Sequence, residues 1–249
     1  MSSFEFKPPL IAHRGASAFA PENTLAAFAV AQELGATWVE FDVMLAACGE
    51  AIIIHDDTLD RTTNGTGNAC EYPYSELKKL DAGSWFGLEF ANERIPTFNE
   101  VITFLKQHHM AANVEIKSVV GQEETVVVKV LDEIRQHWTA SMTPPLISSF
   151  SMPILQHVRK RSPNAAIGVL IHEWFDGWEA ICQELNCVSV NVNEEILSRD
   201  KIKKIKSMDK LILSYTVNSI DRAHDLFMQG VDAVFTDEFP TLCEGLFAR

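Results

Sequence analysis

The sequence predicts a TIM barrel, a (β/α)8 fold of the α/β class, on three observations. Short segments rich in Val and Ile alternate with helix-like segments along most of the 249 residues, which is typical of a parallel sheet with helical crossovers. After one hairpin is set aside, eight strand candidates remain, and polar residues follow several of them, as at the C-terminal face of such barrels. A doubly wound open sheet is the alternative, but no GxGxxG follows the first strand.

The strand candidates are nine short apolar segments. Only a few residues, with Cys48 and Gly49 at the expected turn, separate the second from the third. A parallel crossover needs roughly a dozen or more residues, so this pair should form an antiparallel hairpin that projects from the barrel. The candidates span residues 10–14, 37–43, 51–56, 113–117, 146–150, 166–171, 188–192, 211–217 and 231–237.

Helix signals lie between most of these strands. Residues 97–109 carry an apolar face and begin with Thr97 and Glu100, which have the spacing of a capping box. Residues 23–34 end before Gly35, a helix stop signal. These signals supply crossovers of the length that a parallel barrel requires.

Residues 57–95 interrupt the alternation with a long irregular segment. Segments of this length inside compact domains are usually functional or disordered. Trp85, Phe86 and Phe90 suggest that this one packs on something, as a cap over the site would. No linker composition divides the chain, so we predict a single catalytic domain over residues 1–249 with an insertion at about 57–95.

Composition excludes several classes of partner. The formal net charge is -13, which argues against a nucleic-acid surface and against an anionic membrane surface. No apolar run approaches the roughly 20 residues of a membrane helix, and the N-terminus lacks the pattern of a signal peptide. The five cysteines match no zinc or CxxC spacing. We therefore expect a cytoplasmic protein with free thiols; the oligomeric state is left open.

Two pairs of polar residues stand at strand ends. Glu40 and Asp42 are two residues apart and therefore face the same side of a strand, and so are Glu115 and Lys117. Three carboxylates that converge without a counter-charge would repel each other. A divalent ion resolves this repulsion, and oxygen ligands suit Mg2+ or Ca2+ better than zinc.

Two histidines and two cations complete the set. His13 and His55 also stand at strand ends and can divide general acid and base duties near neutral pH. Arg14 and Lys117 offer positive charge to an anionic oxygen. Each residue alone is more often a structural group, a solvated strand end or a simple salt bridge. Their coincidence at successive strand ends indicates metal-assisted cleavage of a phosphate ester.

These residues resemble the glycerophosphodiester phosphodiesterase family. The combination of HRG, ExD, HD and ExK is highly specific, and the similarity covers nearly the whole chain in order. The matching segments are AHRGASAFAPENT, GATWVEFDV, IIIHDDTLDRTTNGTG, LDAGSWFGLEFANERIPTFNEV, NVEIK, SF, YTVN and GVDAVFTDEF.

The resemblance implies a TIM barrel, one divalent metal ion, Mg2+ or Ca2+, and hydrolysis of a glycerophosphodiester to sn-glycerol 3-phosphate and an alcohol. It also implies roles for single residues. These are His13 and His55 as the acid/base pair, Glu40, Asp42 and Glu115 as metal ligands, and Arg14 and Lys117 as phosphate contacts. The similarity in length is greatest to bacterial cytosolic members, which tolerate many alcohols.

Other positions bear on the substrate pocket. Tyr215 stands where the family often has Trp, so the shape of the glycerol or alcohol pocket differs there. Trp85 and Phe86 are expected to close over the alcohol side of the substrate. In the PENT segment, Glu22 is expected near the site and Asn23 is a candidate helix cap.

Three alternatives remain open from the sequence. One is a non-catalytic glycerophosphate-binding protein on the same barrel, although a binder does not need the two histidines. The second is a metal-dependent lyase or isomerase of carbonyl substrates, and the third is a phospholipase D-type lipid phosphodiesterase. The sequence does not decide which histidine is the acid, or whether water or a glycerol hydroxyl attacks phosphorus.

Overall fold

The fold is an eight-stranded parallel barrel surrounded by helices, seen in a computed structural model that describes residues 4–247. The strands pair in the order β1-β9-β8-β7-β6-β5-β4-β2, and β1 also pairs with β2, which closes the barrel. The strands are β1 (Leu10–Ala12), β2 (Trp38–Leu45), β4 (Ala111–Ile116), β5 (Leu146–Ser149), β6 (Ala166–Ile171), β7 (Ser189–Asn193), β8 (Leu211–Tyr215) and β9 (Ala233–Thr236).

The ninth strand is the predicted hairpin partner. Strand β3 (Ala51–Ile53) pairs antiparallel with the end of β2, so that Leu45 lies opposite Ala51. It stands outside the closed barrel and returns the chain toward the rim. The prediction of a TIM barrel with one added hairpin is therefore confirmed.

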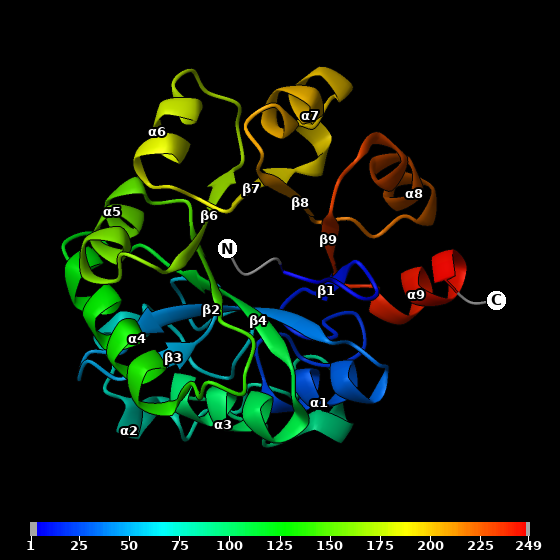
Figure 1. Ribbon diagram of the computed structural model, residues 1–249. Coiled ribbons are helices and arrows are strands. Elements are labelled where there is room, and N and C mark those ends of the chain that lie inside the picture. The colour runs from blue at the N-terminus through cyan, green and yellow to red at the C-terminus, as the bar shows by residue number, and fades with distance from the viewer. Residues whose placement is uncertain (1–3, 248–249) are drawn as a thin grey trace.

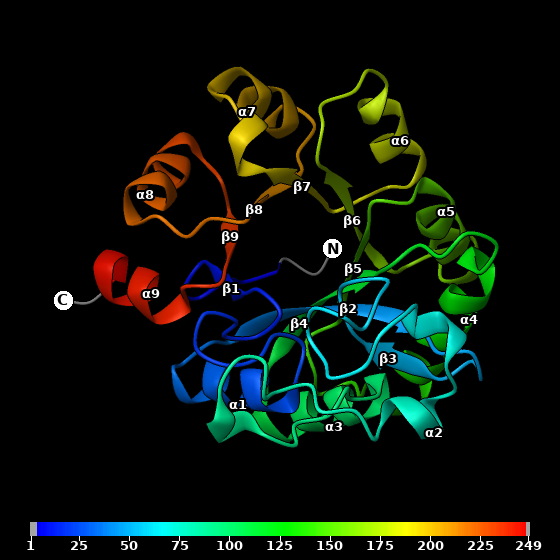
Figure 2. The ribbon, with the colours of Figure 1, turned by 180° about the vertical axis from the view of Figure 1, so that it is seen from behind.

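Helices form a ring around the strands (Figure 1), and the view from behind shows the same ring (Figure 2). They are α1 (Leu25–Glu33), α3 (Phe98–His108), α4 (Glu123–His137), α5 (Met152–Arg161), α6 (Trp178–Glu184), α7 (Arg199–Lys206), α8 (Ile220–Gln229) and α9 (Phe239–Phe247). A 3-10 turn, η3 (Glu194–Ile196), follows β7. Within residues 4–247, no helix is both long and apolar enough to cross a membrane.

Of the two helix caps predicted from the sequence, one is observed and one is not. Thr97 and Glu100 form the predicted capping box at the start of α3. Helix α1 is capped by Thr24, whose side chain accepts a hydrogen bond from the backbone nitrogen of Ala27. The expectation that Asn23 caps this helix is wrong, because Asn23 adopts a left-handed conformation with φ 59° and gives its side chain to the site.

The alternation of side chains along β2 places its carboxylates in the barrel interior. All eight residues of this strand are buried. Phe41 packs outward between Phe28 of α1 and Phe98 of α3, with ring centroids 5.7 and 5.9 Å away. Because side chains alternate along a strand, Glu40 and Asp42 point to the opposite face, which is the lumen.

The insertion is folded and packs on the hairpin. It contains two 3-10 turns, η1 (Ala69–Glu71) and η2 (Leu88–Phe90), and a short helix α2 (Tyr74–Leu77). Its Leu59 and Leu77 share an apolar cluster with Met44 of β2 and Ile52 of β3. The hairpin thus carries the insertion beside the barrel mouth. The five cysteines are free thiols, as expected.

Candidate active site

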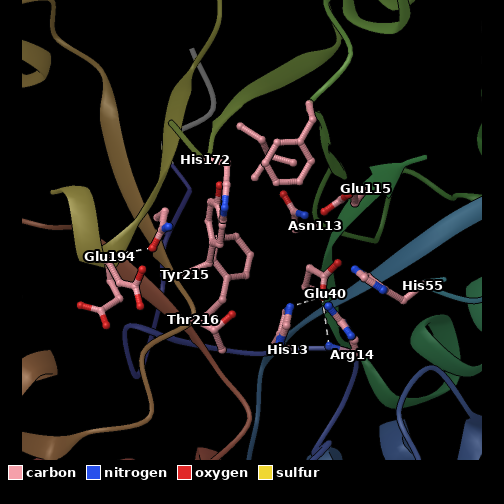
Figure 3. Close-up of a pocket in the computed structure, with 15 residues that line it drawn as sticks. His13, Arg14, Glu40, His55, Asn113, Glu115, His172, Glu194, Tyr215 and Thr216 are labelled. Carbon is pink, nitrogen blue, oxygen red and sulfur yellow. Dashed lines mark hydrogen bonds and ion pairs between the residues drawn. The ribbon is translucent and has the colours of Figure 1, made fainter. Parts of the chain in front are cut away.

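A cavity of about 430 Å³ opens among the C-terminal ends of the strands (Figure 3). It brings together six of the ten predicted site residues, namely His13, Arg14, Glu40, His55, Glu115 and Tyr215. A second cavity of about 420 Å³ adjoins it and shares His55, Glu115 and Phe150, and Lys117 lines this second space. Asp42 is buried behind both. His55 and Glu115 therefore stand between two adjoining cavities.

Glu40, Asp42 and Glu115 form the predicted acidic cluster. Strands β2 and β4 pair in a register that sets Asp42 beside Glu115, and one oxygen from each of the three carboxylates lies within 4.8 Å of the others. Burial, reinforced by the neighbouring carboxylates, raises the pKa of Glu40 well above its usual value. Burial and Asp42 also raise the pKa of Glu115 to about 7. The cluster could hold a metal ion, whose charge would offset this repulsion.

Asp42 keeps its charge because two cations face it. Burial alone would raise the pKa of Asp42, but Lys117 and Arg14 outweigh it and lower that pKa. The Lys117 Nζ lies 3.5 Å from an Asp42 oxygen and 3.2 Å from a Glu115 oxygen. Asn23 fixes the carboxylate by donating its amide hydrogen to Asp42 Oδ2 over 2.9 Å.

Arg14 is held by the turn that follows β1. Arg14 and Gly15 both have a positive φ, 55° and 82°. This turn directs the Arg14 backbone nitrogen at Glu40 Oε2, 3.0 Å away. The guanidinium donates through Nη1 to Glu22 Oε1 over 2.9 Å, and its buried Nε lies 3.6 Å from Asp42 Oδ2. Arg14 is therefore held between two carboxylates at the edge of the acidic cluster.

His13 is oriented by a carboxylate that lies far away in the sequence. Its Nδ1 is 2.7 Å from Asp237 Oδ1, and Ser17 and Asn218 also donate to Asp237. Burial opposes ionisation of Asp237, but these hydrogen bonds hold its pKa well below the usual range. An ionised carboxylate accepts the Nδ1 hydrogen, so Nε2, which is 3.8 Å from Glu40, is free for chemistry.

His55 has the same arrangement on the other side of the cluster. Its Nδ1 lies 2.6 Å from Asp56 Oδ1, and Arg61 lies against Asp56 with a 2.6 Å hydrogen bond from Nε. Burial lowers the pKa of His55, and Arg14 adds to this effect against the opposing charge of Asp42. With Nδ1 held by Asp56, Nε2 is the ring nitrogen left for proton transfer.

The aromatic residues differ in where they lie. Tyr215 lines the cavity, edge-on to Phe150 with ring centroids 5.9 Å apart. Among residues 4–247 its buried hydroxyl has no hydrogen-bond partner, and burial together with Glu115 raises its pKa. Trp85 and Phe86 line neither of the two cavities. They stack edge-to-face on each other in the insertion, so their role as a cap over the alcohol stays a prediction.

Several functional candidates were not recognised in the sequence. Asp237 and Asp56 orient the histidines, and Arg61 binds Asp56. Arg61 also binds Glu22, which lies near the site as expected. The signal for Asp237 was its place after the last strand, which closes the barrel beside β1. The far wall of the cavity carries further polar groups, as Figure 3 shows for Glu194 and His172. For Glu194 the signal was the polar end of strand β7, whereas His172 directly follows strand β6 and has no motif around it.

Comparison with known proteins identifies relatives over most of the chain. The model of the "Glycerophosphoryl diester phosphodiesterase family" matches residues 13–241. A glycerophosphodiester phosphodiesterase of Caldanaerobacter subterraneus is 36% identical over 95% of this chain and 96% of its own length. One from Bacillus subtilis is 31% identical over 93% of this chain and 84% of its own length.

A solved structure shows the same fold with a ligand. It is an Oleispira antarctica phosphodiesterase in complex with the product sn-glycerol-3-phosphate, 37% identical in sequence with a TM-score of 0.93. The similarity covers 95% of this chain and 96% of that one. This chain is therefore similar to that phosphodiesterase in both sequence and fold over almost the full length.

Proposed function

Because this chain belongs to the glycerophosphoryl diester phosphodiesterase family, we propose that it hydrolyses glycerophosphodiesters to sn-glycerol 3-phosphate and an alcohol. One observation carries the proposal beyond the family resemblance: two histidines flank an acidic cluster, and each presents Nδ1 to an aspartate. A protein that only binds glycerophosphate needs cations and a metal, but it has no need of two oriented imidazoles.

In this proposal His13 and His55 act as the acid/base pair through their Nε2 atoms. One accepts a proton from the attacking oxygen, and the other donates a proton to the oxygen of the departing alcohol. The cavities support this division of roles, because His13 lines only the first cavity, whereas His55 lines both cavities. Asp237 and Asp56 keep the two rings in the tautomer that frees Nε2.

Glu40, Asp42 and Glu115 are proposed to hold one divalent ion, Mg2+ or Ca2+. The chemistry of the donors fits such an ion, because three carboxylates supply hard oxygen atoms at one point. When bound there, the ion would polarise a phosphoryl oxygen and offset negative charge. This assignment also gives a reason for burying three acidic side chains together.

Arg14 and Lys117 are proposed to bind the phosphate. Burial opposes the charge of each, but Asp42 and further carboxylates raise the pKa of both, so both stay protonated. A fixed pair of cations inside a protein of net charge -13 gives an anionic substrate one favourable place to bind. We assign this activity to a single domain over residues 1–249, and a cytoplasmic location stays a prediction.

A product assay tests the proposal. Purified protein with Mg2+ or Ca2+ should release sn-glycerol 3-phosphate from glycerophosphocholine and glycerophosphoethanolamine, and a chelator should abolish the release. Absence of product from every diester with either ion would overturn the proposed function. Cleavage of lysophospholipids without cleavage of water-soluble diesters would instead favour a lipid phosphodiesterase.

A further inference from the structure

Arg61, in the insertion, holds two carboxylates with a single guanidinium. Its Nε and Nη2 lie 2.6 and 2.9 Å from the two oxygens of Asp56. Its Nη1 and Nη2 lie 2.6 and 2.8 Å from the two oxygens of Glu22. Both contacts are bidentate. In this arrangement the guanidinium fixes the orientation of the carboxylate, which the single ammonium group of Lys cannot do.

Each of these carboxylates in turn holds a residue of the proposed site. Asp56 accepts the Nδ1 hydrogen of His55 over 2.6 Å, and Glu22 accepts from Nη1 of Arg14 over 2.9 Å. Arg61 therefore lies one step behind the proposed acid/base residue and one step behind the proposed phosphate-binding residue. A single side chain links both, although His55 follows the hairpin and Arg14 lies in the turn after β1.

The segment that carries Arg61 is itself anchored. Leu59 is buried, and its backbone nitrogen donates to the carbonyl of Gly67, which closes a short loop. The Thr63 hydroxyl donates to the Leu59 carbonyl, and Asp60 accepts from the Gly67 nitrogen. The loop packs on the hairpin through Leu59. The guanidinium is therefore presented from a fixed support.

From this geometry, and resting on the proposed function, we propose that Arg61 is a positioning residue that fixes His55 and Arg14 relative to each other. Arg61 acts through Asp56 and Glu22, which are the hydrogen-bond partners of its guanidinium, and not by binding His55 or Arg14 itself. Without the guanidinium, Asp56 and Glu22 would lose their shared counter-charge and would repel each other. The His55 ring and the Arg14 fork would then lose the supports that aim them at one phosphate.

Arg94 supplies a matched control. It also lies in the insertion, but it anchors backbone, because its Nη1 donates to the carbonyls of Lys79 and Leu80. In the part of the chain that the structure describes, its hydrogen bonds go to these carbonyls and not to Glu22 or Asp56. Arg61→Gln and Arg94→Gln thus remove the same charge from the same insertion, and only the first removes the link to the site.

Steady-state kinetics on glycerophosphocholine with saturating metal give the first test. Arg61→Gln should lower kcat/KM by roughly 10- to 100-fold, which is the effect typical of removing a hydrogen-bond partner that orients a functional side chain. Arg61→Lys, which keeps the charge without the fork, should recover only part of this loss, and Arg94→Gln should stay near the wild type. Circular dichroism checks folding, and Arg61→Lys replaces Arg61→Gln if the latter does not fold.

A double-mutant comparison separates positioning from a general structural effect. Asp56→Asn should act mainly on kcat through His55, whereas Glu22→Gln should act mainly on KM through Arg14. In a protein that carries both Asp56→Asn and Glu22→Gln, adding Arg61→Gln should change kcat/KM by no more than about twofold. The two carboxylates through which Arg61 acts on the site are already removed in that background. A full loss in that background would overturn the proposal, and so would unaltered kinetics of Arg61→Gln alone.

A spectroscopic readout works without turnover. The His55 Nδ1 hydrogen, bonded to an ionised carboxylate, should give a far-downfield proton resonance, assigned by its loss in His55→Gln. It should shift or vanish in Arg61→Gln and persist in Arg94→Gln. If the wild type releases no product, the proposed function fails, yet this resonance still decides the role of Arg61. An unchanged resonance in Arg61→Gln would overturn that role.

Discussion

His13 and His55 reach their aspartates by different routes. The partner of His55 is the next residue, Asp56, whereas the partner of His13 is Asp237, 224 residues away. In both cases Nδ1 faces an anion and Nε2 faces the acidic cluster or the cavity. The two imidazoles are therefore oriented in the same way, which is the arrangement that the proposed acid/base pair requires.

The histidine pair leads to a prediction for activity. His13→Ala and His55→Ala should each lose about 10²–10⁴-fold in turnover of natural diesters, because each removes a proton transfer. Both variants should still bind sn-glycerol 3-phosphate in a calorimetric titration, since Arg14, Lys117 and the carboxylates remain.

The leaving group distinguishes the two roles. An activated nitrophenyl diester needs no proton on its leaving oxygen, so the variant that lacks the acid should recover on it. The variant that lacks the base should not recover. Near-normal turnover of natural diesters by both variants would contradict the catalytic assignment and favour a binding protein.

At the scale of elements, the turn after β1 determines much of the site. The strand has only three residues, and the chain then reverses through Arg14 and Gly15 with positive φ at both. A Cβ added to Gly15 would lie 2.7 Å from the backbone carbonyl carbon of Ala27 in α1. Helix α1 is thus packed against this turn so closely that only glycine fits.

Replacing Gly15 by Ala should therefore destabilise the protein and damage the site. The left-handed conformation costs roughly 1–2 kcal/mol for Ala, and the overlap with Ala27 adds about 1–3 kcal/mol more. Gly49→Ala is the control, because Gly49 has φ 80° with nothing within 4 Å of the added carbon. Urea unfolding should show the larger loss for Gly15→Ala, with lowered kcat/KM, and equal losses would refute the packing argument.

The alternation of side chains along strands and the lengths of the connections were enough to predict the strands and the hairpin from the sequence. Nine short strands and one turn too short for a crossover already define a barrel with an added hairpin, and Glu40, Asp42 and Glu115 follow from alternation. Contacts between distant segments were not predictable in this way. Asp237 reaches His13 only because the barrel closes between β9 and β1, and Asn23 leaves the cap position because Asp42 faces it.

On the scale of the whole molecule, the acidic cluster costs stability wherever its carboxylates ionise without a cation. The pKa of Glu115 is about 7 in the folded protein against an ordinary 4.5. Between these values the unfolded chain has lost a proton that the folded chain keeps. A rise in pH therefore favours unfolding across this interval, and Glu115 contributes about 3 kcal/mol to that loss of stability.

We therefore expect Glu115→Gln to gain stability relative to the wild type as pH rises from 5 to 8 in chelator. Glu244→Gln, an exposed glutamate on α9, should show no such trend. Added Mg2+ or Ca2+ should reverse the order at pH 8, because the wild type binds the ion with deprotonated carboxylates and the variant lacks one of them. Thermal unfolding at each pH, with and without ion, measures both effects. Equal shifts by the ion in wild type and Glu115→Gln would place the metal elsewhere, and parallel pH curves in chelator would contradict the buried proton on Glu115.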